Sequence, residues 1–567
     1  MNRTTIDRRS SPLIAQAGDL CLVAAAFERA AMELVPGDGV PPVVFEAPRN
    51  PDFGDFATNV ALQLAKRARR APQQLASELV ERAWTVEPRL RDLVASATSA
   101  AGFINIRLAP AFWQRHVAAI LTEGAKYGRA TAPTGERVSL EFGSANPTGP
   151  LVVVQGRTLS LGDSIAKALR FCGIAVTTEW IVNDAGSQLE TLGRSLYARY
   201  RQLAEPTFPF PEDGYPGTYL VPIAELIRTR VGDRYDRASE TEWLPVFALL
   251  GRDALVAEQQ ATCARFGVRY DHWQSEKALH DSGAVTTSIL ALRERGLTFE
   301  ADGATWMRTT QFGDDKDRVL VRKDGRPTYL APDVAYHHDK LARNDRAILI
   351  LGPDHHGYIA RLNTIAAAFD RAGAIEVLIA QQMTIVRDGE LVSLSKRSGD
   401  LLTLEDVLDE VGVDAARFFF VMMNADSPMT FDLTLAKEQS SDNPVFYVQY
   451  GHARIASIER NAPAELVARA RRGDALERLA QPTELALVRR LAEFPGVVHG
   501  VATALAPSRL ARYAQNVASD FTQFYVACKV LGDDADLSAA RLGLALATKT
   551  VLASALELLG VSAPAQM

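Results

Sequence analysis

The stretch "EFGSANPTGPLVVVQGRTLSLGD" occupies residues 141–163 and has the pattern of a buried strand, a turn rich in Gly and Pro, and the beginning of a helix. Strand–turn–helix units present backbone N–H groups at the helix N-terminus, which favours phosphate binding. Gly149 and Gly156 flank the turn, but residues 152–155 between them are Val-Val-Val-Gln and supply few donors. Taken alone, the stretch is better explained as the buried end of a strand than as a phosphate site.

Strand and helix patterns alternate on both sides of this stretch. Strands are predicted at "RVSLEF", "AVTTEWIVN", "RAILILG" and "EVLIAQQMTIV", which begin at residues 137, 175, 346 and 376. The alternation predicts an α/β fold in which helices cover both faces of a parallel sheet. Residues 200–330 interrupt the rhythm with a Pro- and Gly-rich run, helices and a hairpin pattern. We interpret them as an insertion in this fold.

The N-terminal region alternates helices with short strands. Two helices are predicted within residues 54–83, with Asp55 or Thr58 as the cap of the first, and a strand is predicted at 101–108. The region therefore resembles a small α+β domain.

The C-terminal region has apolar residues at helical spacing and no strand signal, which predicts a helical bundle. The expected domain boundaries are 1–110, 111–136 (a linker helix), 137–405 and 406–567.

Composition restricts the class of protein. A chain of 567 residues is too long for one core, and its net charge of -6 gives no overall indication of nucleic-acid binding. The sequence shows no apolar run of bilayer length and no clear signal-peptide cleavage site. Its four separated cysteines fit neither a disulfide framework nor a zinc site. We expect a cytoplasmic protein that does not associate with membranes.

Two polar loops carry candidate chemistry. "DGELVSLSKRSGDLLTL" (388–404) contains Ser395 and Lys396, and a mobile lysine can pair with phosphate charge in a transition state. "GPDHHGYIARL" follows a predicted strand and contains His355 and His356. No carboxylate or cysteine cluster completes a metal site there, so we expect these histidines to line a cleft instead.

A third candidate lies in "PTYLAPDVAYHHDK". Tyr329 and Asp333 are four residues apart and share one face if the segment is helical. A buried carboxylate beside an aromatic ring suits a guanidinium group. On its own, the pair fits a core Tyr and a helix-start Asp better.

The order of these segments resembles that of bacterial arginyl-tRNA synthetases, a class I family. The resemblance extends over essentially the whole chain and includes several long runs. They are "GDFATN", "GFIN", "SANPTGPL", "VNDAG", "FGDDKDRVL", "GPDHHGY", "SLSKRSGD", "DEVGVDAARFFF", "FDLTLAKEQSSDNPVFYVQYGHARI" and "LGVSAP".

The resemblance implies a Rossmann-type catalytic domain with an insertion, an N-terminal domain that contacts the tRNA elbow, and an all-α C-terminal bundle that contacts the tRNA stem and reads the anticodon. It implies ATP with Mg²⁺, L-arginine and tRNA(Arg) as substrates, with no resident metal, and a monomer. The arginine-binding positions are Glu141, Ser144, Asn146, Tyr329 and Asp333. The ATP-binding positions are Pro147, Gly149, Gly156, Asp354, His355, His356 and Lys396. The catalytic positions are Gln155, Ser395 and Lys396.

The sequence departs from the family pattern in its two signatures. The family has His-Val-Gly-His where this chain has Val152, Val153, Val154 and Gln155, so a phosphate donor is lost and a branched side chain replaces a glycine. The second signature keeps Lys396 and loses its first lysine. The losses concentrate on ATP, while the arginine positions are all present.

Two functions fit these observations. The first is a working arginine–tRNA ligase, in which Gln155 and Lys396 stabilise the developing phosphate charge. The second is an activation-deficient paralogue that binds arginine or tRNA in a regulatory or accessory role. Similarity along the whole chain favours the first, and the losses at Val152 and Val154 favour the second.

Overall fold

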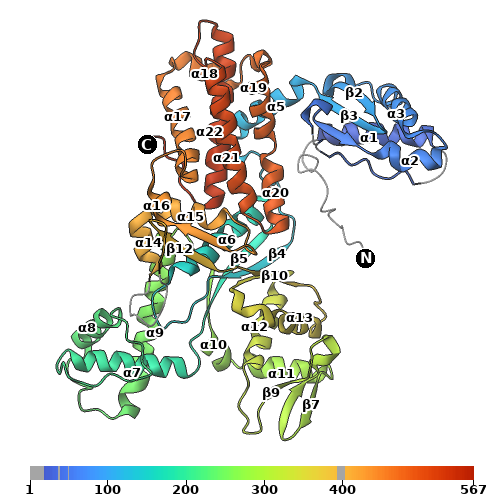
Figure 1. Cartoon of the computed structure of the whole chain (residues 1–567). Helices are drawn as coiled ribbons and strands as arrows, with labels where there is room; N and C mark the ends of the chain where they lie inside the picture. The colour runs from blue at the N-terminus through green and yellow to red at the C-terminus, as the bar shows by residue number, and fades with distance from the viewer. Residues whose placement is uncertain (1–17, 36–38, 47, 49, 393–401) are drawn as a thin grey trace.

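The structure is a computed structural model that describes residues 18–35, 39–46, 48, 50–392 and 402–567. Figure 1 shows a central sheet below an upright helical bundle. A small N-terminal domain lies beside the bundle, and two separate lobes extend from the opposite end of the sheet.

The N-terminal domain has helices packed on a three-stranded antiparallel sheet with the order β1-β3-β2. The short strand β1 begins where a helix was expected, and the following helix has Asn59 at its cap position, so the predictions of Asp55 or Thr58 as caps are wrong. Asp55 instead accepts a hydrogen bond from the Leu108 N–H at 2.7 Å and pairs with Arg489 of the bundle at 3.0 Å. The elements are α1 Gly18–Leu34, η1 Pro51–Phe53, β1 Phe56–Thr58, α2 Val60–Ala68, α3 Pro72–Val86, α4 Leu90–Leu93, β2 Val94–Ala100 and β3 Phe103–Leu108.

The central sheet is parallel throughout and has the order β11-β10-β4-β5-β6. This confirms the predicted α/β class. From β4 the chain proceeds to β5 and β6 on one side and returns to β10 and β11 on the other, so the switch point lies between β4 and β10. The elements are β4 Arg137–Phe142, α6 Val153–Phe171, β5 Ala175–Val182, β6 His272–Ser275, β10 Arg346–Leu351, η4 Pro353–Tyr358, α13 Ile359–Ala368 and β11 Ile375–Ile379.

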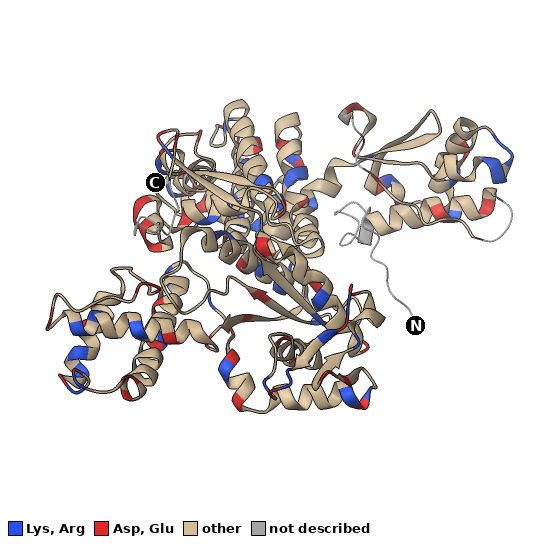
Figure 2. Cartoon of the chain, turned by 60° about the horizontal axis from the view of Figure 1, so that its bottom comes forward, with Lys and Arg blue, Asp and Glu red and all other residues tan. Residues whose placement is uncertain are grey.

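The segment 200–330, interpreted as one insertion, falls in two lobes that span residues 187–265 and 276–343. The edge strand β6 lies between them and joins the central sheet, so it separates the lobes. The two lobes lie apart in Figure 2. In the first lobe the rings of Tyr197 and Trp243 stack at 3.8 Å. The first lobe contains α7 Ser187–Gln202, α8 Leu220–Val231 and α9 Glu240–Arg265; the second contains α10 Glu276–Asp281, α11 Ala284–Glu294, β7 Thr298–Ala301, β8 Ala304–Met307, η3 Thr309–Phe312, β9 Arg318–Val321 and α12 Leu330–Arg343.

The C-terminal part is helical apart from a small sheet with the order β13-β12-β14. Two sequence predictions are wrong here. The run beginning at residue 376 was expected to be one strand, but it forms β11 and β12, which lie in different sheets. The C-terminal region was expected to contain no strand, but it contains β14. The elements are β12 Met383–Arg387, β13 Glu390–Leu391, α14 Leu404–Val411, α15 Val413–Val421, β14 Met429–Asp432, α16 Leu433–Lys437, α17 Pro444–Asn461, α18 Ala464–Arg472, η5 Leu476–Arg478, α19 Pro482–Ala492, α20 Phe494–Ala504, α21 Ser508–Ala527 and α22 Ala535–Leu559.

The bundle is built around α22, which contacts α17, α18 and α21 as well as the linker helix α5 (Pro110–Glu123) and its extension η2 (Gly124–Lys126). By length and composition α22 could cross a membrane, contrary to the expectation that no segment would pass this test. However, 78% of its apolar window is buried inside the protein, as in the core helix of a bundle.

Candidate active site

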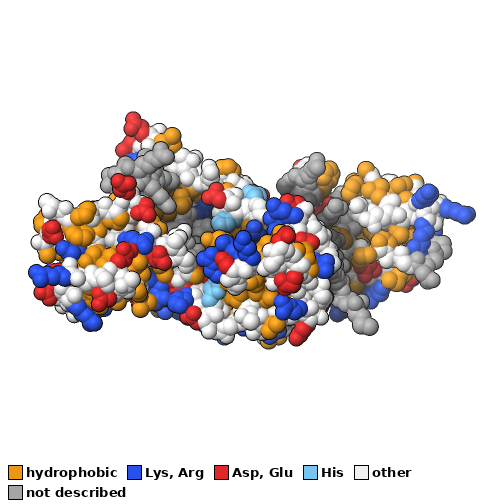
Figure 3. All heavy atoms as spheres, turned by 90° about the horizontal axis from the view of Figure 1, so that it is seen from below, with side chains coloured by type: hydrophobic (Ala, Val, Ile, Leu, Met, Phe, Trp, Pro, Cys, Tyr) orange, Lys and Arg blue, Asp and Glu red, His pale blue; other side chains and the backbone are white. Residues whose placement is uncertain are grey.

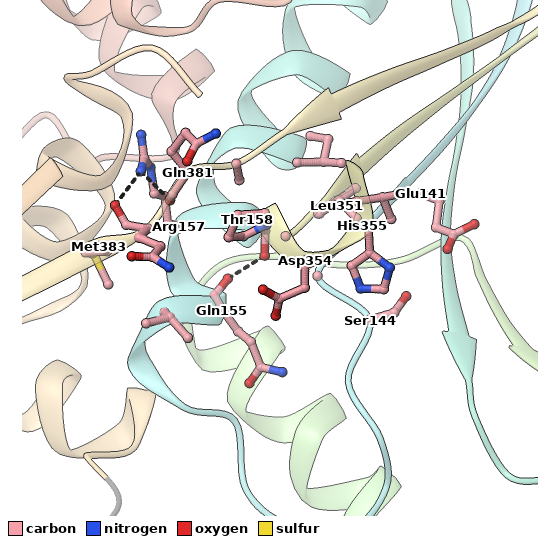
Figure 4. A pocket seen from close by; sticks show the side chains of 18 residues that line it. Glu141, Ser144, Gln155, Arg157, Thr158, Leu351, Asp354, His355, Gln381 and Met383 are labelled. Carbon is pink, nitrogen blue, oxygen red and sulfur yellow. Dashed lines mark hydrogen bonds between the residues drawn. The ribbon is translucent and has the colours of Figure 1, made fainter. Parts of the chain in front are cut away.

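A cavity of about 540 Å³ lies at the switch point of the central sheet. Its walls come from the carboxyl ends of β4 and β10, the first turns of α6, the helix η4 and the loop between β11 and β12 (Figure 4). This is where open α/β sheets bind their ligands. The lining residues are Glu141, Phe142, Gly143, Ser144, Val154, Gln155, Arg157, Thr158, Ile350, Leu351, Gly352, Pro353, Asp354, His355, Ala380, Gln381, Gln382 and Met383.

The turn between β4 and α6 is held in place by side chains from the first lobe. The buried Gln259 of α9 donates its amide hydrogens to the carbonyls of Asn146 and Gly149, at 3.1 and 3.0 Å. The Tyr219 hydroxyl donates to the Thr148 carbonyl at 2.6 Å. A Cβ on Gly149 would lie 3.3 Å from that hydroxyl, so this glycine allows the tyrosine to approach closely.

The first turn of α6 uses most of its free N–H groups within the protein. The four N-terminal N–H groups of a helix have no partner in the helix itself. Here the Val152 N–H donates to Gln155 Oε1 at 2.8 Å, the Val153 N–H to the Leu402 carbonyl at 3.2 Å, and the Gln155 N–H to the Val152 carbonyl at 3.0 Å. Among the described residues, the Val154 N–H has no partner.

Gln155 therefore has a defined orientation. Its Oε1 is held by the Val152 N–H, which leaves the Nε2 hydrogens as donors. Gln155 lines the cavity at the switch point and also a second cavity of about 510 Å³ beside the first lobe. Ser144 and His355 also line both cavities, so the two spaces are neighbours. Figure 4 shows Asp354 and His355 projecting from η4 toward the side where Gln155 and Ser144 lie.

An acidic cluster, made of Asp333, Glu276 and Asp184, lies at the first turns of α12 and α10. Burial raises the pKa of Asp333 to about 6, against the opposing effects of a hydrogen bond from Tyr358 and the charge of Arg361. The Arg361 guanidinium is 3.9 Å from the Asp333 carboxylate. Burial also raises the pKa of Glu276, at the first turn of α10, and the charges of Asp333 and Asp184 add to this effect. Two carboxylates with raised pKa values in one place are suited to a cationic ligand.

Asp184 brings the two acidic side chains together. It follows β5 and accepts hydrogen bonds from the Ser275 hydroxyl at 2.8 Å and the Lys277 N–H at 2.9 Å. Arg252 of α9 pairs with it at 3.2 Å. The start of α10, and with it Glu276, is thereby fixed beside α12. No group of three or more His, Cys, Asp or Glu residues in the described part of the chain is arranged to hold a metal ion.

The residues predicted from the sequence are distributed around these cavities. Glu141, Ser144, Gln155, Asp354 and His355 line the cavity at the switch point, and Asn146 and Gly149 line the second cavity. Asp333 lies in the acidic cluster and lines neither cavity. Four other predicted residues also line neither cavity: Pro147, Gly156, Tyr329 and His356. Ser395 and Lys396 lie outside the described residues.

Two of these positions have evident roles in the fold. A Cβ on Gly156 would lie 2.6 Å from the Phe420 ring, so this glycine lets α6 approach α15. Tyr329 precedes α12 and is 81% exposed, so its ring is accessible rather than buried beside Asp333.

Sequence reasoning missed three residues that shape the site. Gln259 and Glu276 lie in the segment interpreted as an insertion, and nothing in their local pattern distinguishes them. Arg157 did carry a signal, because it is a cation within an apolar helix start. It is 1% exposed and donates to the carbonyls of Gln381, Asn424 and Ser427 at 2.7, 2.8 and 2.7 Å. Arg157 thus fixes the far wall of the cavity.

Three protein-family descriptions match the chain. "Arginyl tRNA synthetase N terminal domain" matches residues 22–108, "tRNA synthetases class I (R), catalytic domain" matches residues 252–439, and "DALR anticodon binding domain" matches residues 448–567.

Curated relatives and a solved structure agree with these matches. The "Arginine--tRNA ligase" of Syntrophotalea carbinolica is 44% identical over 531 residues, which cover 93% of this chain and 95% of that protein. That of Moorella thermoacetica is 45% identical over 551 residues, which cover 96% of this chain and 97% of that protein. The Thermus thermophilus arginyl-tRNA synthetase has the same fold, with a TM-score of 0.73 and 22% identity over 97% of this chain and 100% of that chain.

Proposed function

The chain belongs to the arginyl-tRNA synthetase family, and from this premise we propose how its cavities divide the substrates of an arginine–tRNA ligase. ATP binds in the cavity at the switch point, and the guanidinium of L-arginine binds at the acidic cluster. The terminal adenosine of tRNA(Arg) approaches through the second cavity. The half-buried carboxylate of Asp333, with Glu276 beside it, is the observation that carries the assignment of arginine.

The ATP site uses a small number of donors. Gln155 Nε2, the Val154 N–H and His355 are available around the cavity, and Asp354 is placed to interact with the Mg²⁺ that accompanies the nucleotide as substrate. Pro147, Gly149 and Gly156 contribute by shaping the turn and its packing. His356 and Lys396 remain the additional phosphate ligands expected from the sequence. Seen from the side of the two lobes, His and basic side chains gather near the middle of the face, which suits an anionic substrate (Figure 3).

The arginine site combines carboxylates with polar groups of the turn. Asp333 and Glu276 face the guanidinium, and a charged, bidentate hydrogen-bonded pair is the strongest interaction available to that group. Glu141 holds the α-ammonium group, while Ser144 and Asn146 orient the backbone atoms of the substrate. Tyr329, exposed at the mouth, covers the bound amino acid. The substrate carboxylate then points toward the ATP cavity.

The reaction proceeds in two steps. A carboxylate oxygen of arginine attacks the α-phosphorus of ATP, the bond to pyrophosphate breaks, and arginyl-adenylate forms. A ribose hydroxyl of the terminal adenosine then attacks the carbonyl carbon, and AMP leaves as the new ester forms. Gln155, Ser395 and Lys396 stabilise the charge that develops on the phosphate oxygens in the first step.

The tRNA contacts involve the outer domains. The bundle has a cavity of about 840 Å³ whose lining includes Tyr450, Arg454, Tyr525 and Lys529. Arg454 lies over the rings of Tyr450 and Tyr525, at 4.7 and 5.1 Å. Aromatic rings and cations in one cavity suit an unstacked base, which supports anticodon reading by the bundle. The N-terminal domain contacts the elbow of the same tRNA, and the chain acts as a cytoplasmic monomer.

The test is ATP–pyrophosphate exchange with arginine and tRNA(Arg). Exchange that requires both L-arginine and ATP supports the ligase assignment, and Asp333→Ala should abolish it. Arginine binding without any exchange would instead indicate the activation-deficient alternative, which similarity to ligases over nearly the full chain does not favour.

A further inference from the structure

A buried lysine lies behind the arginine site. The ammonium group of Lys340, on α12, is fully buried and forms an ion pair with Glu141 Oε2. Glu179 Oε2 is 3.7 Å away, and the ammonium lies 4.0 Å from the centre of the Tyr336 ring. A buried cation of this kind is costly unless it is paired and hydrogen-bonded, so its retention needs an explanation.

The two glutamates near Lys340 differ in their other partners. Glu179 also accepts hydrogen bonds from the Ser139 hydroxyl at 3.0 Å and the Tyr336 hydroxyl at 3.4 Å, and Arg343 donates to it at 3.4 Å. Burial and the charges of both glutamates raise the pKa of Tyr336 well above its usual value, so its hydroxyl keeps its proton and can donate. Glu179 is thus held by its other neighbours, and Lys340 is primarily the partner of Glu141.

Glu141 differs from Glu179 in lining the cavity at the switch point. It is the last residue but one of β4, whereas Glu179 is completely buried in β5. Figure 2 shows acidic positions on strands of the central sheet. Lys340 gives this carboxylate a counter-charge and a donor that fixes its orientation.

We propose that Lys340 is a positioning residue for substrate arginine: it fixes the Glu141 carboxylate so that this group receives the α-ammonium of the amino acid. The inference rests on the proposed function, because it needs Glu141 in the arginine site. Lys340 itself does not touch the substrate.

The helix α12 provides the geometric basis for this role. Asp333 and Lys340 are seven residues apart, which places them on one face of the helix, two turns from each other. The helix therefore carries two groups of the arginine site. Asp333 is the carboxylate that pairs with the guanidinium, and Lys340 is the cation that orients Glu141, the carboxylate for the α-ammonium.

The test compares two ligands that differ only in the α-ammonium. L-Arginine and argininic acid, in which a hydroxyl replaces the ammonium, are titrated calorimetrically into the full-length chain. Lys340→Met removes the charge and keeps a similar length. It should weaken binding of L-arginine about 10- to 100-fold and binding of argininic acid less than about threefold, because only the first ligand uses Glu141. Lys437→Met, which removes a surface lysine paired with Glu410, is the matched control and should change neither.

Several outcomes would overturn the inference. Equal losses for both ligands would mean a merely structural role, and unchanged affinity for both in a folded Lys340→Met variant would mean no role. If the wild-type protein bound no L-arginine, the proposed function would fail together with this inference. If the wild type bound L-arginine normally and Lys340→Met gave equal losses or unchanged affinity for both ligands, this inference alone would be overturned.

A second variant keeps the test decisive if Lys340→Met does not fold. The double variant Glu141→Gln/Lys340→Met leaves no unpaired buried charge. Since Lys340 acts through Glu141, the double variant should bind L-arginine within about threefold of Glu141→Gln alone. A further loss beyond that margin would show that Lys340 acts independently and would overturn the proposal.

Discussion

Asp333 offers a test of the arginine site through pH. Its burial raises the pKa from 3.8 to about 6, so the empty site is mostly ionised at pH 7 and mostly protonated at pH 5. A guanidinium pairs with the carboxylate and not with the neutral acid. The ionised fraction falls about tenfold between pH 7 and pH 5, and the affinity for L-arginine should fall by about the same factor.

The same shift predicts an effect on stability. The folded chain retains the Asp333 proton to a higher pH than the unfolded chain. The free energy of unfolding therefore falls as the pH rises from 3.8 to about 6, and this contribution is fully lost above that range. The shift corresponds to at most about 3 kcal/mol, and screening at this partly exposed side chain makes the effect smaller. Asp333→Asn should therefore raise the free energy of unfolding at pH 7 while it lowers arginine affinity about 100-fold.

Calorimetric titration of L-arginine from pH 5 to pH 7.5 measures the first effect, and denaturant unfolding of wild type and variant at pH 7 measures the second. Asp370→Asn is the control, because this carboxylate after α13 is exposed and should change neither quantity. An arginine affinity that is constant between pH 5 and pH 7 would refute the role of Asp333, as would equal affinity for neutral citrulline. An Asn variant less stable than wild type at pH 7 would refute the argument from burial.

Three further predictions concern the rest of the site. The combined change Val152→His, Val154→Gly and Gln155→His should raise ATP–pyrophosphate exchange about 100-fold, whereas an already fast wild type with no gain in the variant would show that the signature is dispensable. Gln259→Leu removes two hydrogen bonds from the turn that carries Asn146 and should lower the exchange rate about tenfold; an unchanged rate would contradict its role. Arg454→Ala should weaken tRNA(Arg) binding about tenfold in a filter assay and leave arginine affinity unchanged. If the variant bound tRNA(Arg) as tightly as the wild type, the bundle cavity would not contact the tRNA.

Local sequence signals explain which strands could be predicted. β10, "RAILIL", is close to a continuous apolar run, as expected for a strand buried on both faces of a parallel sheet, and β4 and β5 mix apolar residues with polar ones such as Ser139, Thr178 and Glu179. β6 is a partly exposed edge strand of four residues, "HWQS", and has no such run. The adjacent polar residues Gln381 and Gln382 were the available signal that β11 and β12 are separate strands, because neither can continue a buried strand without partners.

The site was less accessible than the fold because its parts are distant in sequence. Glu141 and Lys340 are 199 residues apart, and no local pattern connects them. Tyr329 and Asp333 alone suggested an ordinary helix start, and only the resemblance to a family gave Asp333 a function. Gln259 and Glu276 required the three-dimensional arrangement, since each acts on a neighbour contributed by another part of the chain.

The structure also changes the account of the altered signature. The sequence alone suggests that two lost histidines weaken ATP binding through their missing side chains. The first turn of α6 shows a second contribution, because Gln155 engages the Val152 N–H and Leu402 engages the Val153 N–H. With the partners found among the described residues, the Val154 N–H alone is left for a phosphate, so the helix terminus offers less than its geometry suggests. A histidine in place of Gln155 would add a ring donor and also release the Val152 N–H. The restored signature should therefore gain backbone as well as side-chain donors, which is why the combined change is expected to exceed the sum of its single changes.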